Sequence, residues 1–330
     1  MTILQFVAAL LISVVVTAVV GRFLVPALRR IKAGQTIRED GPVWHSSKQG
    51  TPIMGGIMFI SGITAACLIA GFRLMLEGDF RHVFILLFAL VYAAIGFLDD
   101  YEKLRKKQNL GLKAKQKLVL QVVAALGFVL LMRLTGNLTP NLYIPFFDVS
   151  IPIPEPIYFI FAAFVAVGTV NSVNITDGVD GLATGVTLPV AIWFAVIAFL
   201  MSFAAVGIFA AALVGGLVAF LFFNFHPAKV FMGDTGSLFL GGAVCAMAFA
   251  IDMPLILIPL GVIYFVETLS DIIQVSYFKL TKGKRVFKMA PIHHHFEMCG
   301  WSEYKLFAVF TTVSAVFAVI SYFGVLGKLT

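Results

Sequence analysis

The chain has 330 residues, of which 60% are hydrophobic and only 12% are charged. A soluble protein of this length has too little interior to bury so much apolar surface, so the composition predicts a polytopic helical membrane protein. The formal net charge of +7 does not indicate a nucleic-acid partner, because the basic residues collect in loops on one side of the predicted membrane region.

Ten mainly apolar stretches have the roughly 17–25 residues that a helix needs to cross a bilayer. The first has no basic segment before it, so we expect a retained helix rather than a cleaved signal peptide. The sixth and seventh form one run that is too long for a single helix and is divided near Met201 and Ser202. The proline of IDMP separates the eighth from the ninth. The stretches are residues 3–28, 53–71, 82–98, 118–134, 156–173, 186–201, 203–223, 236–251, 254–278 and 305–327.

An even number of spans places both termini on one side of the membrane. The segments that share the other side, together with Lys305, contain 19 of the 24 lysine and arginine residues. Because basic residues are retained in the cytoplasm, we expect this basic side to be cytoplasmic and both termini to be extracytoplasmic. The basic-side segments are 29–52, 99–117, 174–185, 224–235 and 279–304.

Segment 141–153 on the other side alternates weakly between apolar and polar residues and is interrupted by prolines. This pattern predicts a small external β-hairpin. The chain shows no internal repeat and no low-complexity linker, so residues 1–330 are expected to form a single all-α integral-membrane domain.

Five polar clusters lie in or next to the segments assigned to the cytoplasmic side. Polar groups near membrane depth are costly, so their grouping marks functional sites. Nothing comparable occurs on the other side, and we therefore expect the function on the cytoplasmic face. The clusters are GFLDDYEK (96–103), NSVNITDGVDG (171–181), NFHPAKVFMGDTGS (224–237), ETLSDIIQ (267–274) and KMAPIHHHFE (288–297).

The adjacent carboxylates Asp99 and Asp100 follow the third predicted span. Mg²⁺ is usually bound by one or two carboxylates together with substrate phosphates. The alternative is that the two acids only end the helix in water, but acidic residues oppose the dipole at a helix C-terminus. We therefore expect these two residues to serve metal and phosphate chemistry.

Asp177 and Asp180 are spaced three residues apart, and each is followed by glycine. If this segment is helical, both carboxylates lie on one face, and the glycines allow a ligand to approach the backbone closely. The amides of Asn171 and Asn174 suit recognition of a nucleobase or a sugar. The alternative is an ordinary turn rich in Asn, Asp and Gly.

Asp234 precedes a turn of small residues that opens the eighth span. Backbone N–H groups and the dipole at a helix N-terminus favour anions. Asp234 is therefore either a plain N-cap or a carboxylate that holds a metal ion against a bound diphosphate. Asn224 and His226 lie at the other end of the same short loop.

Three consecutive histidines, His293, His294 and His295, are expected to point in different directions. They suit donation to phosphate oxygens or proton transfer near neutral pH. A structural zinc site is not indicated, because no nearby Cys/His pair completes one. The lysines that follow the ninth span are interpreted as positive-inside charges attracted to anionic lipid.

Together the clusters favour phosphoryl-group chemistry on a lipid. Two anions, a nucleotide diphosphate and a lipid phosphate, must approach each other, which requires neutralisation by Mg²⁺ and lysines and accurate positioning. Lys48 and Lys115 flank the acidic clusters. Apolar grooves between the helices suit a long lipid tail.

Five motifs occur in an order that closely resembles the phospho-N-acetylmuramoyl-pentapeptide transferase family: GTPIMGGI (50–57), GFLDDYEK (96–103), NSVNITDGVDGLA (171–183), NFHPAKVFMGDTGS (224–237) and APIHHHFE (290–297). That family belongs to the polyprenyl-phosphate N-acetylhexosamine-1-phosphate transferase superfamily, and the resemblance covers essentially the whole chain. The histidine run followed by Phe-Glu favours this branch over the N-acetylglucosamine-phosphate branch.

The resemblance implies transfer of phospho-MurNAc-pentapeptide from UDP-MurNAc-pentapeptide to undecaprenyl phosphate, giving lipid I and UMP. This is the first membrane step of peptidoglycan synthesis, and it implies a Mg²⁺-dependent homodimer in the bacterial plasma membrane. Asp234 would ligate Mg²⁺, Asp99 would bind or activate the lipid phosphate, and Asp100 would support both, with His293 as a further catalytic candidate. The candidate substrate-binding residues are Lys48, Lys115, Asn171, Asn174, Asp177, Asp180, Asn224, Phe231, Gln274, His294 and His295.

Two mechanisms and two other functions stay open at this point. The lipid phosphate attacks the nucleotide directly, which we prefer because a phosphate monoester is largely ionised at neutral pH, or a carboxylate first forms a phospho-enzyme. A sister enzyme would transfer GlcNAc-1-phosphate to the same lipid. An ion-coupled transporter would use Glu267 and Asp271 near the bilayer centre, but the polar clusters of this chain lie on one face.

Overall fold

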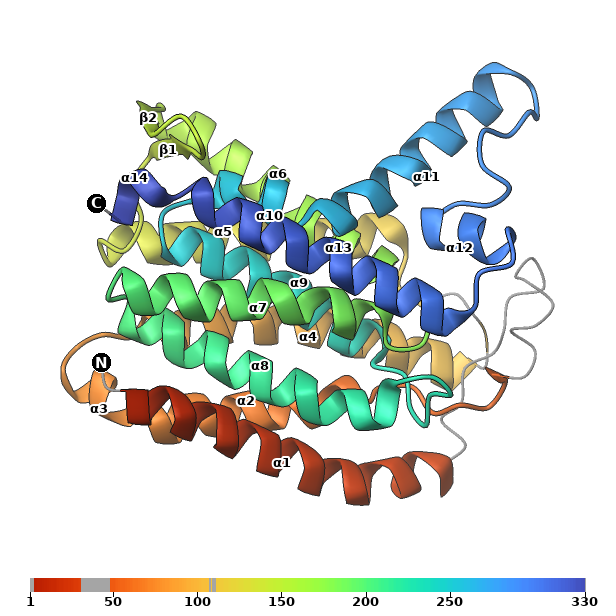
Figure 1. The fold of residues 1–330 in the computed structure, drawn as a ribbon, viewed down its shortest axis with the longest axis horizontal. Coiled ribbons are helices and arrows are strands. Elements are labelled where there is room, and N and C mark those ends of the chain that lie inside the picture. The colour runs from red at the N-terminus through yellow and green to blue at the C-terminus, as the bar shows by residue number, and fades with distance from the viewer. Residues whose placement is uncertain (1–2, 31–47, 107, 109–110, 330) are drawn as a thin grey trace.

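The computed structural model describes residues 3–30, 48–106, 108 and 111–329, which form a bundle of long, side-by-side helices (Figure 1). The helices and strands are α1 (Ile3–Arg30), α2 (Gly56–Ala70), α3 (Phe72–Leu76), α4 (Arg81–Lys106), α5 (Ala114–Leu134), β1 (Asn141–Ile144), β2 (Val149–Pro152), α6 (Glu155–Thr176), α7 (Leu182–Leu200), α8 (Ala204–Asn224), α9 (Gly233–Ala250), η2 (Pro254–Ile256), α10 (Leu257–Leu260), α11 (Val262–Leu280), α12 (Ile292–Glu297), α13 (Glu303–Phe323) and α14 (Leu326–Leu329).

Within the described ranges, eight helices are long and apolar enough to cross a membrane: α1, α4, α5, α6, α7, α8, α9 and α13. The prediction of an all-α polytopic membrane protein is therefore confirmed. The two other predicted stretches fall on α2, which has only 15 residues, and on a helix that is broken into two parts. Each of the ten stretches thus lies on helix, while the count of ten membrane crossings stays a prediction.

The ninth predicted stretch, residues 254–278, is not one straight helix. Its first part, Pro254–Leu260, is bent by 80° from α11 at Gly261. Pro259 cannot donate a backbone hydrogen bond and Gly261 weakens a helix, so the break falls where the sequence supports a helix least. As a result α11 diverges from the bundle toward the end where α12 lies (Figure 1).

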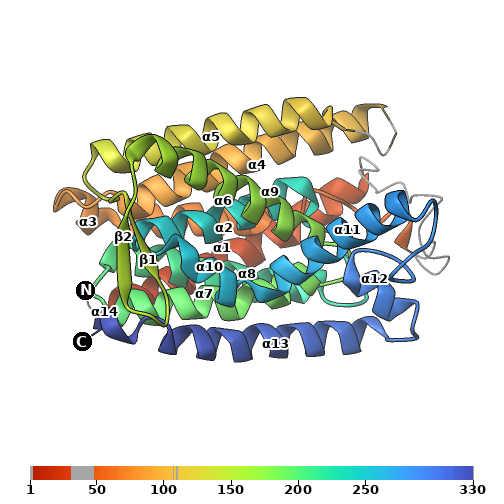
Figure 2. The same ribbon diagram turned by 90° about the horizontal axis from the view of Figure 1, so that it is seen from above.

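The predicted turns and hairpin are confirmed. Helix α7 ends at Leu200 and α8 begins at Ala204, with Ser202 at a positive φ of 59° between them. Strands β1 and β2 pair antiparallel, with Asn141 opposite Pro152. The ends of the described chain lie near this hairpin, at one end of the bundle, while α12 and the α6–α7 and α8–α9 connections lie at the other (Figures 1 and 2). We call the latter the polar end.

Helix α9 forms the centre of the bundle and packs against α4 and α6. It approaches α4 tightly at Gly96, where a Cβ atom would lie 2.1 Å from the backbone oxygen of Asp234. A side chain at position 96 would therefore push the two helices apart. This close approach brings the last turns of α4 against the first turn of α9, and it positions the acidic residues described next.

Candidate active site

Three carboxylates meet at the polar end, where α4 ends and α9 begins. Asp99 and Asp100 lie on α4 and are only 4% and 2% exposed, and Asp234 lies in the first turn of α9. One oxygen from each of the three carboxylates lies within 4.8 Å of the others. The structure thus joins two sequence clusters that are 134 residues apart.

Asp100 holds the start of α9. Its Oδ1 accepts a hydrogen bond from the backbone N–H of Asp234 at 3.1 Å, and its Oδ2 accepts from the N–H and the hydroxyl of Thr235 at 2.9 Å and 2.7 Å. The first N–H groups of a helix have no partner within the helix, so this carboxylate caps α9 from another helix. The interpretation of Asp234 as a plain N-cap is wrong: the N-cap position is Met232, and Asp234 lies inside the first turn.

Two lysines neutralise this cluster. Lys103 Nζ lies 2.6 Å from Asp99 Oδ2 and 3.1 Å from Asp234 Oδ2, and Lys117 Nζ lies 2.8 Å from the same Asp234 oxygen. Lys115, which the sequence analysis favoured, is exposed on α5 and does not join the cluster. The sequence alone did not distinguish Lys117 from Lys115. In the structure, Lys117 lies one turn before Gln121, the first buried residue of α5, and therefore faces the cluster.

Asn174 on α6 fixes the remaining oxygen of Asp234. Its amide nitrogen donates to Asp234 Oδ1 at 2.9 Å and to the hydroxyl of Ser237 at 2.7 Å. Asn171, one turn earlier, instead donates to Gln121 Oε1 and to the backbone oxygen of Val167, both at 2.8 Å. Of the two asparagines, only Asn174 therefore contacts the carboxylate cluster.

Asp177 and Asp180 lie in the turn between α6 and α7, not on a helix. Helix α6 ends at Thr176, and Gly181 adopts a positive φ of 73° before α7 begins. The two carboxylates therefore do not share a helix face, and the turn interpretation is confirmed. Burial raises the pKa of Asp177 well above its ordinary value, and the nearby carboxylates Asp234, Asp100 and Asp180 raise it further.

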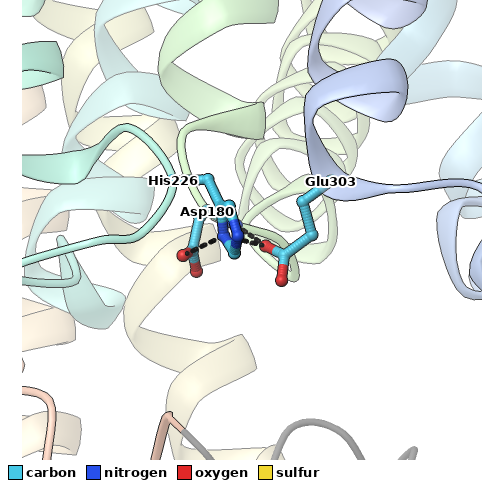
Figure 3. A group of neighbouring side chains, drawn as sticks. All are labelled: Asp180, His226 and Glu303. Atoms are coloured by element: carbon cyan, nitrogen blue, oxygen red, sulfur yellow. Dashed lines mark hydrogen bonds and ion pairs between the residues drawn. The ribbon is translucent and has the colours of Figure 1, made fainter.

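Asp180 belongs to a second charged group at the polar end, with His226 and Glu303 (Figure 3). His226 Nδ1 lies 2.9 Å from Asp180 Oδ2 and 3.4 Å from Glu303 Oε2. Lys48 Nζ lies 2.8 Å from Asp180 Oδ1 and 2.7 Å from Glu303 Oε2. The Lys48 ammonium thus supplies the cation that this group needs, and it does not lie in the Asp99–Asp234 cluster.

This ion-pair group joins four parts of the chain, because Glu303 begins α13 and His226 follows α8. Burial acts to raise the pKa of Asp180, but the charge and hydrogen bond of Lys48 and the hydrogen bonds from Ala228 N–H and His226 outweigh it, so the pKa lies below its ordinary value. Glu303 was not predicted from the sequence, because a single acidic residue at the start of a helix is a common stabilising feature.

The three histidines diverge, as expected. His293 Nδ1 lies 2.9 Å from Glu267 Oε2 and His294 Nδ1 lies 2.6 Å from Glu297 Oε2, while His295 Nδ1 accepts from the backbone N–H of Lys288 at 3.1 Å. Only His293 is fully buried.

Three other candidate residues make contacts that hold the polar end together. The side chain of Gln274 bonds the backbone of Val286 and Phe287. Asn224 accepts from Thr184 and donates to the backbone oxygen of Val230. Phe231 pairs its backbone with Pro52 and Gly55. These groups position the segments around the carboxylate cluster.

Comparison with known proteins identifies the chain. The model of glycosyl transferase family 4 matches residues 82–252, which contain all three carboxylates of the cluster. A phospho-N-acetylmuramoyl-pentapeptide-transferase from Caldanaerobacter subterraneus is 45% identical over 97% of this chain and 98% of its own length. Proteins with the same name from Halalkalibacterium halodurans and Staphylococcus aureus are each 44% identical and match over 95% and 96% of this chain, and 95% and 97% of their own lengths. The chain therefore belongs to the phospho-N-acetylmuramoyl-pentapeptide transferase family.

Proposed function

We propose that this protein transfers phospho-MurNAc-pentapeptide from UDP-MurNAc-pentapeptide to undecaprenyl phosphate, producing lipid I and UMP. The reaction takes place at the cytoplasmic face of the plasma membrane and requires Mg²⁺ as cofactor. The protein acts as a homodimer in this proposal. The observation that carries this proposal is the meeting of Asp99, Asp100 and Asp234 with Lys103 and Lys117 at one end of a membrane bundle.

The carboxylate cluster suits a magnesium ion. Its donor atoms are carboxylate oxygens, which Mg²⁺ prefers as ligands. A magnesium ion held by one or two carboxylates keeps further coordination positions for substrate phosphates. Asp234 is the principal ligand in this proposal, because the oxygens of Asp100 bond the backbone at the start of α9. The partners of Asp234 are side chains, those of Asn174, Lys103 and Lys117, which can shift when a metal binds. When bound, the metal neutralises the diphosphate and stabilises the charge of the leaving UMP.

The protein residues bring two anions together. Asp99 lies near the end of a membrane-spanning helix, where the phosphate of a membrane lipid is expected. Lys103 and Lys117 donate to phosphate oxygens, and Asn174 holds Asp234 in place. Since the lipid phosphate is largely ionised at neutral pH, it attacks the β-phosphate directly while Asp99 positions it.

Asp177 and the Asp180 group face the nucleotide and sugar part of the donor in this proposal. The basic residues of the polar-end segments support a cytoplasmic location, because positive charges are retained on that side. The donor is a soluble nucleotide, which is consistent with this placement.

The test is a UMP-release assay on the detergent-purified protein with undecaprenyl phosphate, UDP-MurNAc-pentapeptide and Mg²⁺. We expect metal-dependent release by the wild type and loss of release in Asp234→Asn. The control is Asp252→Asn, which removes a partly buried carboxylate that bonds Thr139 near the other end of the bundle, and we expect it to keep activity. Release only with UDP-GlcNAc would assign the chain to the sister reaction, and no release with either donor would overturn the transferase.

A further inference from the structure

Glu267 and His293 form a buried pair beside the candidate active site. Glu267 lies on α11 and His293 on α12, and their side chains are 0% and 1% exposed. The distance between His293 Nδ1 and Glu267 Oε2 is 2.9 Å. An ionised carboxylate only accepts hydrogen bonds, so Nδ1 carries the shared hydrogen and Nε2 is the edge of the ring directed elsewhere.

The Nε2 edge is directed at the loop that carries Asp177 and Asp180. A Cβ atom built on Gly178 would lie 2.2 Å from Nε2, so only glycine allows the loop to rest on the ring in this position. The ring thus supports the backbone between the two carboxylates. A rotation of the ring would change this contact.

Both groups of the pair also have a buried polar atom with no hydrogen-bond partner among the described residues, namely His293 Nε2 and Glu267 Oε1. Buried polar atoms are almost always paired, and an exception calls for a functional explanation. The neighbouring Thr268 anchors α11 to Ser172 of α6 at 2.7 Å. This bond fixes the part of α11 that carries Glu267 to α6, the helix that leads into the Asp177–Asp180 loop.

We infer that Glu267 is a positioning residue of the transferase site: it fixes the imidazole of His293, and the ring seats the Asp177–Asp180 loop against the bound nucleotide donor. Carboxylates orient metal-binding histidines in the same way, and their removal there typically costs about 10–100-fold in metal affinity or activity; we expect a loss of the same order for His293. This inference deepens the proposed function and rests on it. It gives Glu267 a role in the transfer reaction rather than in ion transport.

The experiment compares Glu267→Gln with Asp271→Asn, in the full-length protein. Asp271 is the matched control, because it is a second carboxylate near His293, lies one turn further along α11, and has no hydrogen bond to the ring among the described residues. We expect Glu267→Gln to lower kcat/KM for UDP-MurNAc-pentapeptide by about 10–100-fold, while the KM for undecaprenyl phosphate changes less than about twofold. Asp271→Asn should stay within about threefold of wild type in both constants, since Asp271 makes no hydrogen bond to the ring among the described residues, whereas Glu267→Gln replaces the carboxylate acceptor of the bond to His293 with a weaker, neutral amide.

A double-mutant cycle separates positioning from general destabilisation. In a His293→Gln background, adding Glu267→Gln should change kcat/KM by less than about threefold, because residues that act as a unit are not additive. The inference would be overturned if the losses in kcat/KM of the two single variants multiplied in the double variant. Equal effects of Glu267→Gln and Asp271→Asn would overturn it as well. If Glu267→Gln lowers the melting temperature too far, Glu267→Asp replaces it, with a smaller loss expected in the same constant.

The shift in melting temperature that UDP-MurNAc-pentapeptide causes in the same variants measures the change in donor affinity without turnover. The proposed function fails if the wild type releases no UMP. If the wild type releases UMP but Glu267→Gln and Asp271→Asn have the same kcat/KM, the positioning role of Glu267 is wrong while the proposed function stands.

Discussion

The carboxylate of Asp100 on α4 caps α9 at Thr235, accepting from its backbone N–H at 2.9 Å and from its hydroxyl at 2.7 Å. Met232, the N-cap residue of α9, provides no side-chain cap. The contact ties the end of one membrane helix to the beginning of another. It therefore sets the position of Asp234, one residue before Thr235.

The first prediction concerns this cap. Asp100→Asn should lower the free energy of unfolding by about 1–2 kcal/mol, because an amide offers one acceptor oxygen instead of two to the orphan N–H groups of α9. UMP release should fall as well, since Asp234 loses its support. Thr235→Val is the milder control, because it removes only the hydroxyl contact. A melting temperature that is lowered more by Thr235→Val than by Asp100→Asn would contradict the capping role.

The second prediction separates two lysines on one helix. Lys117→Met should lower kcat by about 10²–10³-fold, the usual cost of removing one donor that stabilises charge in the transition state. Lys115→Met should stay within about twofold of wild type, since Lys115 is exposed and outside the cluster. Steady-state UMP release by both variants is the measurement. Equal losses would show that α5 presents a different face to the site.

The third prediction uses the opposite pKa shifts of Asp177 and Asp180, measured without Mg²⁺ or substrate. The pKa of Asp177 is raised, so its neutral form is favoured by folding, and that stability is lost as the pH rises through the folded-state pKa. Asp177→Asn should therefore raise the melting temperature near pH 8, and the gain should disappear below about pH 4, where the unfolded carboxyl is protonated too.

Asp180 should behave in the opposite way. Its pKa is lowered, so its ionised form stabilises the fold above the unfolded-state pKa, and this contribution is lost as the pH falls through the folded-state pKa. Asp180→Asn should lower the melting temperature near pH 8, and the deficit should shrink in acid. Changes of the same sign in both variants would contradict the two electrostatic environments.

The fourth prediction tests the contact between α4 and α9. Gly96→Ala should destabilise the protein by about 1–3 kcal/mol, the usual cost of overpacking, and lower activity, because its Cβ would lie 2.1 Å from the backbone oxygen of Asp234. Gly127→Ala on α5 is the matched control, since nothing lies within 4 Å of its Cβ position. This control should be neutral or stabilising by up to about 1 kcal/mol. Thermal unfolding in detergent ranks the two variants, and equal destabilisation would contradict the close contact.

Short-range sequence patterns were enough to predict the positions of the helices. The apolar runs predicted every long helix, because a membrane-spanning segment must satisfy its own backbone and therefore shows its length in the sequence. The turn at Ser202 and the hairpin at residues 141–153 were also predicted from local residue types. The bend of 80° at Gly261 was not predicted: Pro259 and Gly261 mark where a helix is weak, but not the direction in which the chain continues.

The sequence by itself determined the class of the protein, the helical stretches and the residue types at the polar end, because hydropathy and motif spacing are properties of short segments. Only the tertiary structure decided the partners of those residues. It selected Lys117 over Lys115, made Asp100 the cap of α9, paired Lys48 with Asp180 and Glu303, and set Glu267 against His293. The physical reason is that a hydrogen bond or an ion pair requires its atoms to lie within about 3–4 Å, and packing between helices far apart in the chain determines which atoms meet.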